Sequence, residues 1–240
     1  MARKSDLYIV NSITFARAPL VFLFFILALV ESYNHSKATI FLATTFLAVA
    51  SFTDLLDGML ARKWKVESKF GAMADPLMDK MFYIVVFPTL VFLLGRRAIQ
   101  NDDPAQLTHA LVMLCFTVLY LLRDQWVTFL RSIAAGYDAD VRANWMGKLR
   151  TALSFPFGCV VYVYIAHDKK EWVRRLLPLG VMYAVELFLI LLNLASIVFY
   201  TRQYLPYIRR SLRPNREKTK RSWRKRFRPR EKPVKTNESV

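Results

Sequence analysis

The sequence predicts an all-α polytopic membrane protein with six transmembrane helices and an N-terminal amphipathic helix at the membrane surface. Hydrophobic residues make up 55% of the 240 residues, and the mean hydropathy is +0.24. Several apolar runs approach or reach the length that crosses a bilayer. The length alone would also allow one or two soluble domains, but this composition disfavours them.

We expect three parts along the chain. Residues 1–17 are too polar to cross a bilayer and suit an amphipathic juxtamembrane helix. Residues 18–203 would form the membrane domain, and residues 204–240 a polybasic tail that is disordered or a surface helix. The six spans are expected at about 18–30, 37–57, 71–95, 107–131, 148–165 and 177–200.

Basic residues predict the orientation. The N-terminus, the 62–69 turn, the 131–150 loop and the C-terminus would share one strongly basic side, which the positive-inside rule assigns to the cytosol. The 168–175 loop, with four Lys and Arg, is an exception on the opposite side. Both termini are therefore expected in the cytosol.

The C-terminal tail carries much of the net charge of +17. Residues 201–240 hold 15 Lys and Arg against 3 Glu, a net charge of +12. Such a segment beside a span is attracted to anionic lipid headgroups, which we favour over nucleic acid because no folded nucleic-acid module accompanies it. A topology anchor without a specific ligand is the alternative. Cys115 and Cys159 lie in apolar runs, and the 3 His form no cluster that would suggest zinc.

The most informative stretch runs from Asp54 to Lys80 and contains two pairs of aspartates between apolar runs. Carboxylates in such a setting are costly and point to a function. At about 100° per helical residue, each pair falls on one face of its own helix, and a short polar turn would join the two helices antiparallel. Both pairs then lie near the same membrane surface. The four residues are Asp54, Asp57, Asp75 and Asp79.

Four facing carboxylates would repel one another unless cations lay between them. Hard divalent cations such as Mg²⁺ or Mn²⁺ take oxygen ligands, so the four aspartates predict a site for two metal ions. Two-metal sites act on phosphate oxygens. Gly58 would let a bulky ligand approach the helix, and Arg62 adds a positive charge suited to phosphate.

Residues 54–79 read D-x2-D-G-x2-A-R-x8-G-x3-D-x3-D. This pattern resembles the signature of the CDP-alcohol phosphatidyltransferase family at every fixed position. The segments NSITFARAP (11–19), ADPLMDK (74–80), LLRDQWVTFLRS (121–132) and WMGKLRT (145–151) extend the likeness. The last three are similar to the phosphatidylglycerophosphate synthase branch, although Asp124 stands where that branch usually has Glu. The likeness covers about residues 7–155; the sixth span is generic.

The resemblance implies a metal-dependent membrane enzyme, usually a homodimer, with its active site open to the cytosol. The distribution of the family suggests a bacterial inner membrane. It would transfer a phosphatidyl group from CDP-diacylglycerol to glycerol 3-phosphate and release CMP, as a step of phospholipid biosynthesis. Asp79 is the general base that the resemblance implies. The residues implied for the CDP-lipid are Asn11, Thr14, Arg17, Asp57, Gly58, Ala61, Arg62 and Gly71.

The acceptor phosphate needs cations on the cytosolic side. The candidates are Arg123, Arg131, Lys148 and Arg150. Lys80 projects about 100° from Asp79 on an ideal helix, so a snorkelling anchor is favoured over a ligand role. For Asn11, Thr14 and Arg17, spacing alone leaves a solvated face as an equal alternative.

Two other functions are compatible with parts of the pattern. The same chemistry could use inositol phosphate, serine or phosphatidylglycerol as the acceptor, because the acceptor residues are less distinctive than the aspartates. A proton- or ion-coupled transporter could also carry Asp residues in its helices. That function leaves Gly58, Arg62 and Gly71 without a role. An inactive scaffold is disfavoured because the motif is intact.

Overall fold

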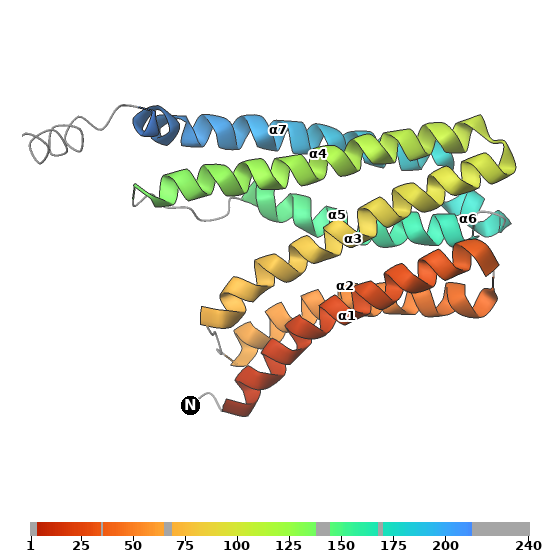
Figure 1. Cartoon of the computed structure of the whole chain (residues 1–240), viewed down its shortest axis with the longest axis horizontal. Coiled ribbons are helices and arrows are strands. Elements are labelled where there is room, and N and C mark those ends of the chain that lie inside the picture. The colour runs from red at the N-terminus through yellow and green to blue at the C-terminus, as the bar shows by residue number, and fades with distance from the viewer. Residues whose placement is uncertain (1–3, 35, 65–68, 138–144, 168–169, 213–240) are drawn as a thin grey trace, which may run out of the picture.

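The computed structural model describes residues 4–34, 36–64, 69–137, 145–167 and 170–212, and these residues are almost entirely helical. The prediction of an all-α protein is confirmed over these residues. The helices follow one another along the chain with short connections (Figure 1). They are α1 (Lys4–Asn34), α2 (Lys37–Trp64), α3 (Lys69–Asn101), α4 (Pro104–Ala135), α5 (Trp145–His167), α6 (Glu171–Leu176) and α7 (Leu179–Ser211).

Five helical segments in the described part of the chain are long and apolar enough to cross a membrane. They are Tyr8–Asn34, Leu77–Asn101, Pro104–Ala135, Leu149–His167 and Leu179–Ser211. In α2, the corresponding apolar segment is shorter and covers Lys37–Thr53. The structure therefore supports an integral membrane protein with at least these five hydrophobic helices, and the sixth crossing stays a prediction.

Residues 4–17 do not form a helix of their own, because α1 continues unbroken from Lys4 through Pro19 to Asn34. One buried stripe runs along this helix at intervals of three and four residues, so its polar beginning packs on the same face as its apolar remainder. The expected N-terminal surface helix stays a prediction. The stripe consists of Val10, Thr14, Arg17, Val21, Phe24, Ala28 and Glu31.

The long helices alternate in direction, so at each end of the bundle one helix finishes where the next begins (Figure 1). At the α2–α3 end, α2 finishes at Trp64 and α3 begins at Lys69. At the α3–α4 end, α3 finishes at Asn101 and α4 begins at Pro104. Helix α1 packs on α2 and α3, α4 packs on α3 and α7, and α5 contacts α2, α3 and α7. Helix α5 thus connects the group formed by α1, α2 and α3 with α7.

A cluster of buried aromatic rings joins α3, α4 and α5. Phe82 stacks on Phe155 with ring centroids 4.0 Å apart, and Tyr83 lies 4.7 Å from Tyr120. Phe116 on α4 meets Phe157 on α5 edge to face at 5.5 Å. Aromatic pairs in these geometries add to the stability that burial alone provides. The cluster begins one turn after Asp79 and fixes the helices that surround it.

Helix α7 continues beyond the expected membrane domain. It ends at Ser211, so the expected boundary between residues 203 and 204 falls inside a helix. Tyr204 is buried and stacks on Tyr200, with ring centroids 6.2 Å apart. The remainder of the expected tail, residues 213–240, lies outside the described residues.

Candidate functional site

The aspartate motif lies on two successive helices close to the end that they share. Asp54 and Asp57 belong to the second half of α2, and Asp75 and Asp79 to the beginning of α3. The expected pair of helices is confirmed, with the turn between them at residues 65–68, outside the described residues. Among the four aspartates, the structure describes the side chain of Asp79 alone.

The side chain of Asp79 is held by Arg17 from α1. Arg17 Nη1 donates to Asp79 Oδ1 over 2.6 Å, although the two residues are 62 positions apart. The Arg17 side chain is 1% exposed, whereas that of Asp79 is 35% exposed. A buried arginine therefore orients a carboxylate that is itself partly exposed, which is the arrangement that a reactive group requires.

Asp124 on α4 forms the next ionic cluster. Lys80 Nζ lies 3.2 Å from Asp124 Oδ2 and donates to Thr128 Oγ1 over 3.0 Å. Arg150 Nη2 from α5 lies 3.4 Å from Asp124 Oδ1. Lys80 thus binds protein groups, and the snorkelling anchor that its helical direction favoured stays a prediction. Asp124, where the sequence departs from the usual Glu, links α3, α4 and α5.

Arg150 is held in place by an aromatic ring and keeps donors available. Its guanidinium carbon lies 4.0 Å from the centroid of the Tyr120 ring, a cation–π contact. The residue is 4% exposed. Its Nε and Nη1 atoms are buried and have no hydrogen-bond partner in the described structure. Buried donors without acceptors are unfavourable, so a ligand with anionic oxygens would complete this site.

Two further arginines on α4 are positioned by α7. Arg123 donates to Ser196 Oγ from Nε at 2.9 Å and from Nη2 at 2.6 Å. Arg131 Nη2 donates to Tyr200 Oη over 3.4 Å. Both guanidinium groups also lie over the Tyr200 ring, with distances to the centroid of 5.0 Å for Arg123 and 5.5 Å for Arg131. Helix α7 thereby aligns two cations that the sequence had linked to the acceptor phosphate.

A cavity of about 720 Å³ brings these groups together. Its polar lining includes Asp79, Asp124 and three arginines. Its apolar lining includes Phe52, Phe155 and Pro156. Three arginines against two carboxylates, both already paired with cations, leave a positive excess among the described side chains. The cavity therefore suits an anionic ligand. The arginines are Arg123, Arg131 and Arg150.

The remaining expected residues have more limited descriptions. Thr14 is 2% exposed and donates to the Val10 carbonyl oxygen at 3.3 Å. Asn11 lies one turn before Thr14 on α1 and is half-buried. Gly58, Ala61 and Arg62 on α2, Gly71 on α3 and Lys148 on α5 lie on helices, and their surroundings fall outside the described side chains.

The donor chemistry around Asp79 fits a hard divalent cation. The motif offers carboxylate oxygens only, and Mg²⁺ and Mn²⁺ prefer such ligands. The backbone brings both aspartate pairs to the α2–α3 end. Within the described side chains there is no group of three or more metal-binding residues, because Asp54, Asp57 and Asp75 are not among them.

Sequence reasoning missed Ser196 and Tyr200, since it treated the last span as generic. A signal was present: α7 contains the polar residues Asn193, Ser196, Tyr200 and Tyr204 at intervals of three and four within an apolar run. All four are buried. Polar side chains on one face of a membrane helix usually face the protein interior and mark functional regions.

Comparisons with known proteins agree with the motif. The family model for CDP-alcohol phosphatidyltransferase matches residues 7–201. A protein of Cereibacter sphaeroides named CDP-diacylglycerol–glycerol-3-phosphate 3-phosphatidyltransferase is 40% identical over 143 residues, which are 60% of this chain and 59% of that protein. Proteins of the same name from Treponema pallidum and Bacillus subtilis are 32% and 33% identical over 171 and 149 residues.

These matches cover 69% of this chain and 70% of the Treponema protein, and 59% and 69% for the Bacillus protein. A Haemophilus influenzae protein of the same name is 30% identical over 129 residues, which are 53% of this chain and 61% of that protein. The chain thus spans about three fifths of the length of the Haemophilus and Cereibacter relatives. The family match extends through the arginine-positioning part of α7 and includes the whole motif. The chain belongs to the CDP-alcohol phosphatidyltransferase family.

Proposed function

We propose that the protein transfers a phosphatidyl group from CDP-diacylglycerol to glycerol 3-phosphate, releasing CMP and forming phosphatidylglycerophosphate. Family membership supports the phosphatidyl transfer, and the names of the relatives support this acceptor. The acceptor is the finer part of the proposal. It depends on the cavity that α2, α3, α4 and α5 line.

The observation that carries the proposal is the set of buried guanidinium N–H groups without acceptors. They are Nε and Nη1 of Arg150 and Nε of Arg131, as far as the described residues show. Both residues line the cavity that Asp79 also lines. A phosphate group matches the planar fork of arginine and would accept several of these donors. We assign the acceptor phosphate to Arg123, Arg131 and Arg150, with Lys148 as a fourth candidate.

Asp79 is the proposed general base. The acceptor hydroxyl oxygen forms a bond to the lipid-linked phosphorus, the bond from that phosphorus to the CMP oxygen breaks, and CMP leaves with the bonding electrons. Asp79 takes the proton of the attacking hydroxyl. Arg17 acts as a positioning residue, because its hydrogen bond orients the partly exposed carboxylate.

We propose that Asp54, Asp57, Asp75 and Asp79 hold two Mg²⁺ or Mn²⁺ ions. Bound there, the metal would supply neutralisation of the diphosphate and of the charge on departing CMP. For the CDP-lipid, we propose contacts from three helices. The residues are Asn11, Thr14 and Arg17 on α1, Asp57, Gly58, Ala61 and Arg62 on α2, and Gly71 on α3.

An acceptor panel tests the function. Purified full-length protein receives CDP-diacylglycerol, Mg²⁺ and one acceptor at a time: glycerol 3-phosphate, inositol phosphate, serine or phosphatidylglycerol. CMP release is expected to be fastest with glycerol 3-phosphate. Faster turnover with another alcohol would show that this alcohol, and not glycerol 3-phosphate, is the acceptor. No CMP release with any of them would contradict the enzymatic function.

We further propose six membrane crossings, with α2 as the second, residues 1–17 at the cytosolic surface and both termini in the cytosol of a bacterium. Single cysteines introduced near both termini and in the α3–α4 turn, in a Cys115→Ser/Cys159→Ser background, test the topology. A membrane-impermeant thiol reagent added to intact cells is expected to label only the turn. Labelling of a terminus would show that this terminus lies outside the cytosol and would contradict the proposed topology.

We also propose a homodimer and a tail that contacts anionic lipid headgroups. Cross-linking in native membranes is expected to yield a dimer band, and a purely monomeric pattern would exclude the homodimer.

The proposed contact of the tail with lipid is tested by proteolysis. Protein reconstituted in vesicles is digested with trypsin at low salt. Cleavage after residue 212 is expected to be slower in anionic than in neutral vesicles, whereas equal rates would favour the anchor-only alternative.

A further inference from the structure

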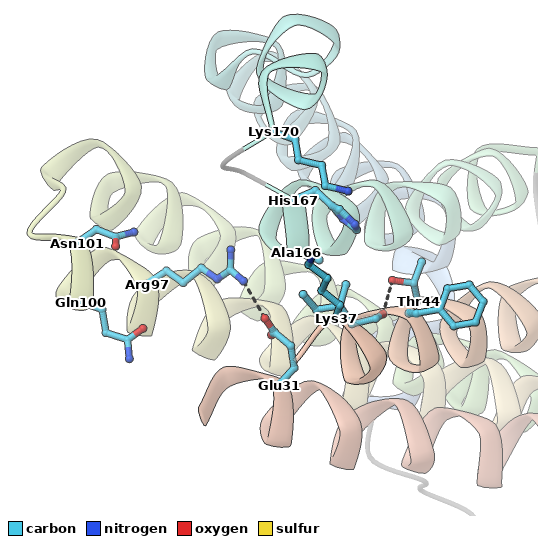
Figure 2. A pocket seen from close by; sticks show the side chains of 11 residues that line it. Glu31, Lys37, Thr44, Arg97, Gln100, Asn101, Ala166, His167 and Lys170 are labelled. Atoms are coloured by element: carbon cyan, nitrogen blue, oxygen red, sulfur yellow. Dashed lines mark hydrogen bonds and ion pairs between the residues drawn. The ribbon is translucent and has the colours of Figure 1, made fainter. Parts of the chain in front are cut away.

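A second large cavity, of about 760 Å³, lies at the α3–α4 end of the bundle, away from Asp79 (Figure 2). Its walls come from the end of α1, the beginning of α2, the end of α3 and the region between α5 and α6. On α1, Glu31 in this cavity is 14 residues from Arg17, which corresponds to about 21 Å along the helix. The cavity is therefore separate from the proposed active site.

The buried carboxylate in this cavity is already compensated. Glu31 is 1% exposed, and its Oε1 lies 3.0 Å from Arg97 Nη2. Arg97 also donates to the Ile165 carbonyl oxygen. Figure 2 shows the Arg97 guanidinium turned toward Glu31. This pair contributes no net charge to the cavity.

Two lysines leave the cavity with a positive excess. Lys37 opens α2, and Lys170 directly precedes α6. Both are exposed, and neither side chain has a hydrogen-bond or ion-pair partner within the described residues. His167 lies beside them, and its buried Nδ1 likewise has no partner there. Two ammonium groups and an imidazole nitrogen that can donate in one of its tautomers thus line the cavity and are available to an anion.

The next turn of α2 in the cavity lining is apolar. Ile40 and Phe41 follow Lys37 on α2, and Phe41 is 69% exposed. Thr44 lies one turn further, with its hydroxyl donating to the Ile40 carbonyl oxygen, so it presents little unsatisfied polarity. From Lys37 to Thr44 the surface changes from cationic to apolar over about 10 Å of helix. This direction runs from the helix terminus toward the middle of the bundle, as the headgroup and acyl chains of a lipid do.

We propose that this cavity is a binding site for an anionic phospholipid, whose phosphate lies between Lys37, Lys170 and His167 and whose acyl chain runs along Ile40 and Phe41. A free phosphate would satisfy the lysines but would leave the apolar wall exposed. A zwitterionic lipid would cover that wall, but the cationic part of its headgroup already balances its phosphate, so the positive excess of the cavity would stay uncompensated. The proposal does not depend on the proposed reaction at Asp79.

Native mass spectrometry of the full-length protein in detergent tests the site, with phosphatidylserine as the probe and phosphatidylcholine as the neutral comparison. The double variant Lys37→Gln/Lys170→Gln is expected to weaken the tightest phosphatidylserine binding by about tenfold, because basic residues near a membrane surface each contribute strongly to anionic lipid binding. The matched control is Arg174→Gln/Arg175→Gln. It removes two exposed charges from α6, outside the cavity lining, and is expected to retain wild-type binding.

Phe41→Ser and inorganic phosphate distinguish the two possible sources of the anion. Phe41→Ser is expected to weaken phosphatidylserine binding several-fold, and millimolar phosphate is expected not to displace the lipid. Unchanged binding in the lysine variant, or an equal loss in the arginine control, would overturn the site. Displacement by phosphate together with wild-type binding in Phe41→Ser would overturn the lipid as its occupant. Thermal unfolding without lipid verifies that each variant is folded.

Discussion

Arg17 on α1 donates a 2.6 Å hydrogen bond to Asp79 on α3. This contact joins the polar beginning of the chain to the last carboxylate of the aspartate motif. The arginine is almost completely buried while the carboxylate is partly open. The beginning of α1 therefore completes the site on α3, and its polar residues are more than a solvated face.

Replacing Arg17 by Gln is expected to lower the rate of CMP release by about 100-fold, because a reactive group that loses its orientation by even 1 Å can lose that much. Arg17→Lys is expected to give an intermediate rate, since it keeps the charge but loses the planar fork. Initial rates at saturating substrates measure the effect. Lys63→Gln, an exposed charge change near the end of α2, serves as the control and is expected to behave as wild type. Wild-type turnover in Arg17→Gln would remove the positioning role.

Asp79→Asn is expected to abolish turnover while leaving CDP-diacylglycerol binding largely intact, because the amide cannot accept the proton of the attacking hydroxyl. Lipid binding and CMP release are measured on the same preparation. Asp102→Asn is a suitable control: Asp102 is exposed at the opposite end of the bundle and has a φ of 49°, a conformation that asparagine tolerates. Retention of activity in Asp79→Asn would exclude the general-base role.

Removal of divalent cations is expected to stop CMP release completely, since the diphosphate would face the carboxylates of the motif without neutralisation. EDTA-treated protein is assayed before and after addition of Mg²⁺ or Mn²⁺. Either ion is expected to restore the rate, whereas Asp57→Asn is expected to require a higher ion concentration for half-maximal activity. Full activity in EDTA, without added metal, would contradict the proposed metal dependence.

Ser196→Ala is expected to raise the KM for glycerol 3-phosphate by about tenfold with little change in kcat. Arg123 loses both of its hydrogen bonds to Ser196, and a hydrogen bond to a charged group contributes about 1.5–3 kcal/mol. Thr201→Val is the matched control, because Thr201 accepts a hydrogen bond between the same two helices from Trp126, which, unlike Arg123, does not line the cavity. An equal rise in KM in both variants would indicate a general loosening of α4 and α7.

The sequence was sufficient to predict the two helices that carry the aspartates and the end of the bundle that these helices share. Asp and Gly at fixed spacings between apolar runs have few structural explanations, so helices α2 and α3 and the turn between them follow from local pattern. The arginines of α4 and α5 could be proposed as phosphate ligands from charge and topology. The cavity that they share arises from tertiary packing, which cannot be predicted by considering each span separately.

Contacts between distant helices could not be predicted from the sequence, for a physical reason. The bond from Arg123 to Ser196 joins residues 73 positions apart, and its existence depends on the rotation of α7 about its axis. That rotation is set by packing against α4 and α5, including the burial of Tyr200 and Tyr204. An apolar span specifies its length well but its rotation poorly, because lipid and protein interior are both apolar.

Gly147→Ala is expected to weaken acceptor binding more than it weakens the fold. A Cβ atom at this position would lie 2.9 Å from Tyr200 Oη and 3.9 Å from Arg123 Nη2, so the buried Tyr200 ring would have to move. This ring lies under the guanidinium groups of both Arg123 and Arg131. A rise of several-fold in the KM for glycerol 3-phosphate is therefore expected, measured by CMP release.

Gly95→Ala provides the control for Gly147→Ala. No atom lies within 4 Å of a Cβ at Gly95, so its expected effect is only the gain of up to about 1 kcal/mol that alanine has over glycine inside a helix. Thermal unfolding of both variants separates stability from binding. If Gly147→Ala keeps the wild-type KM, the Tyr200 ring does not set the positions of the two arginines, and the acceptor phosphate would have to rely on Arg150 instead.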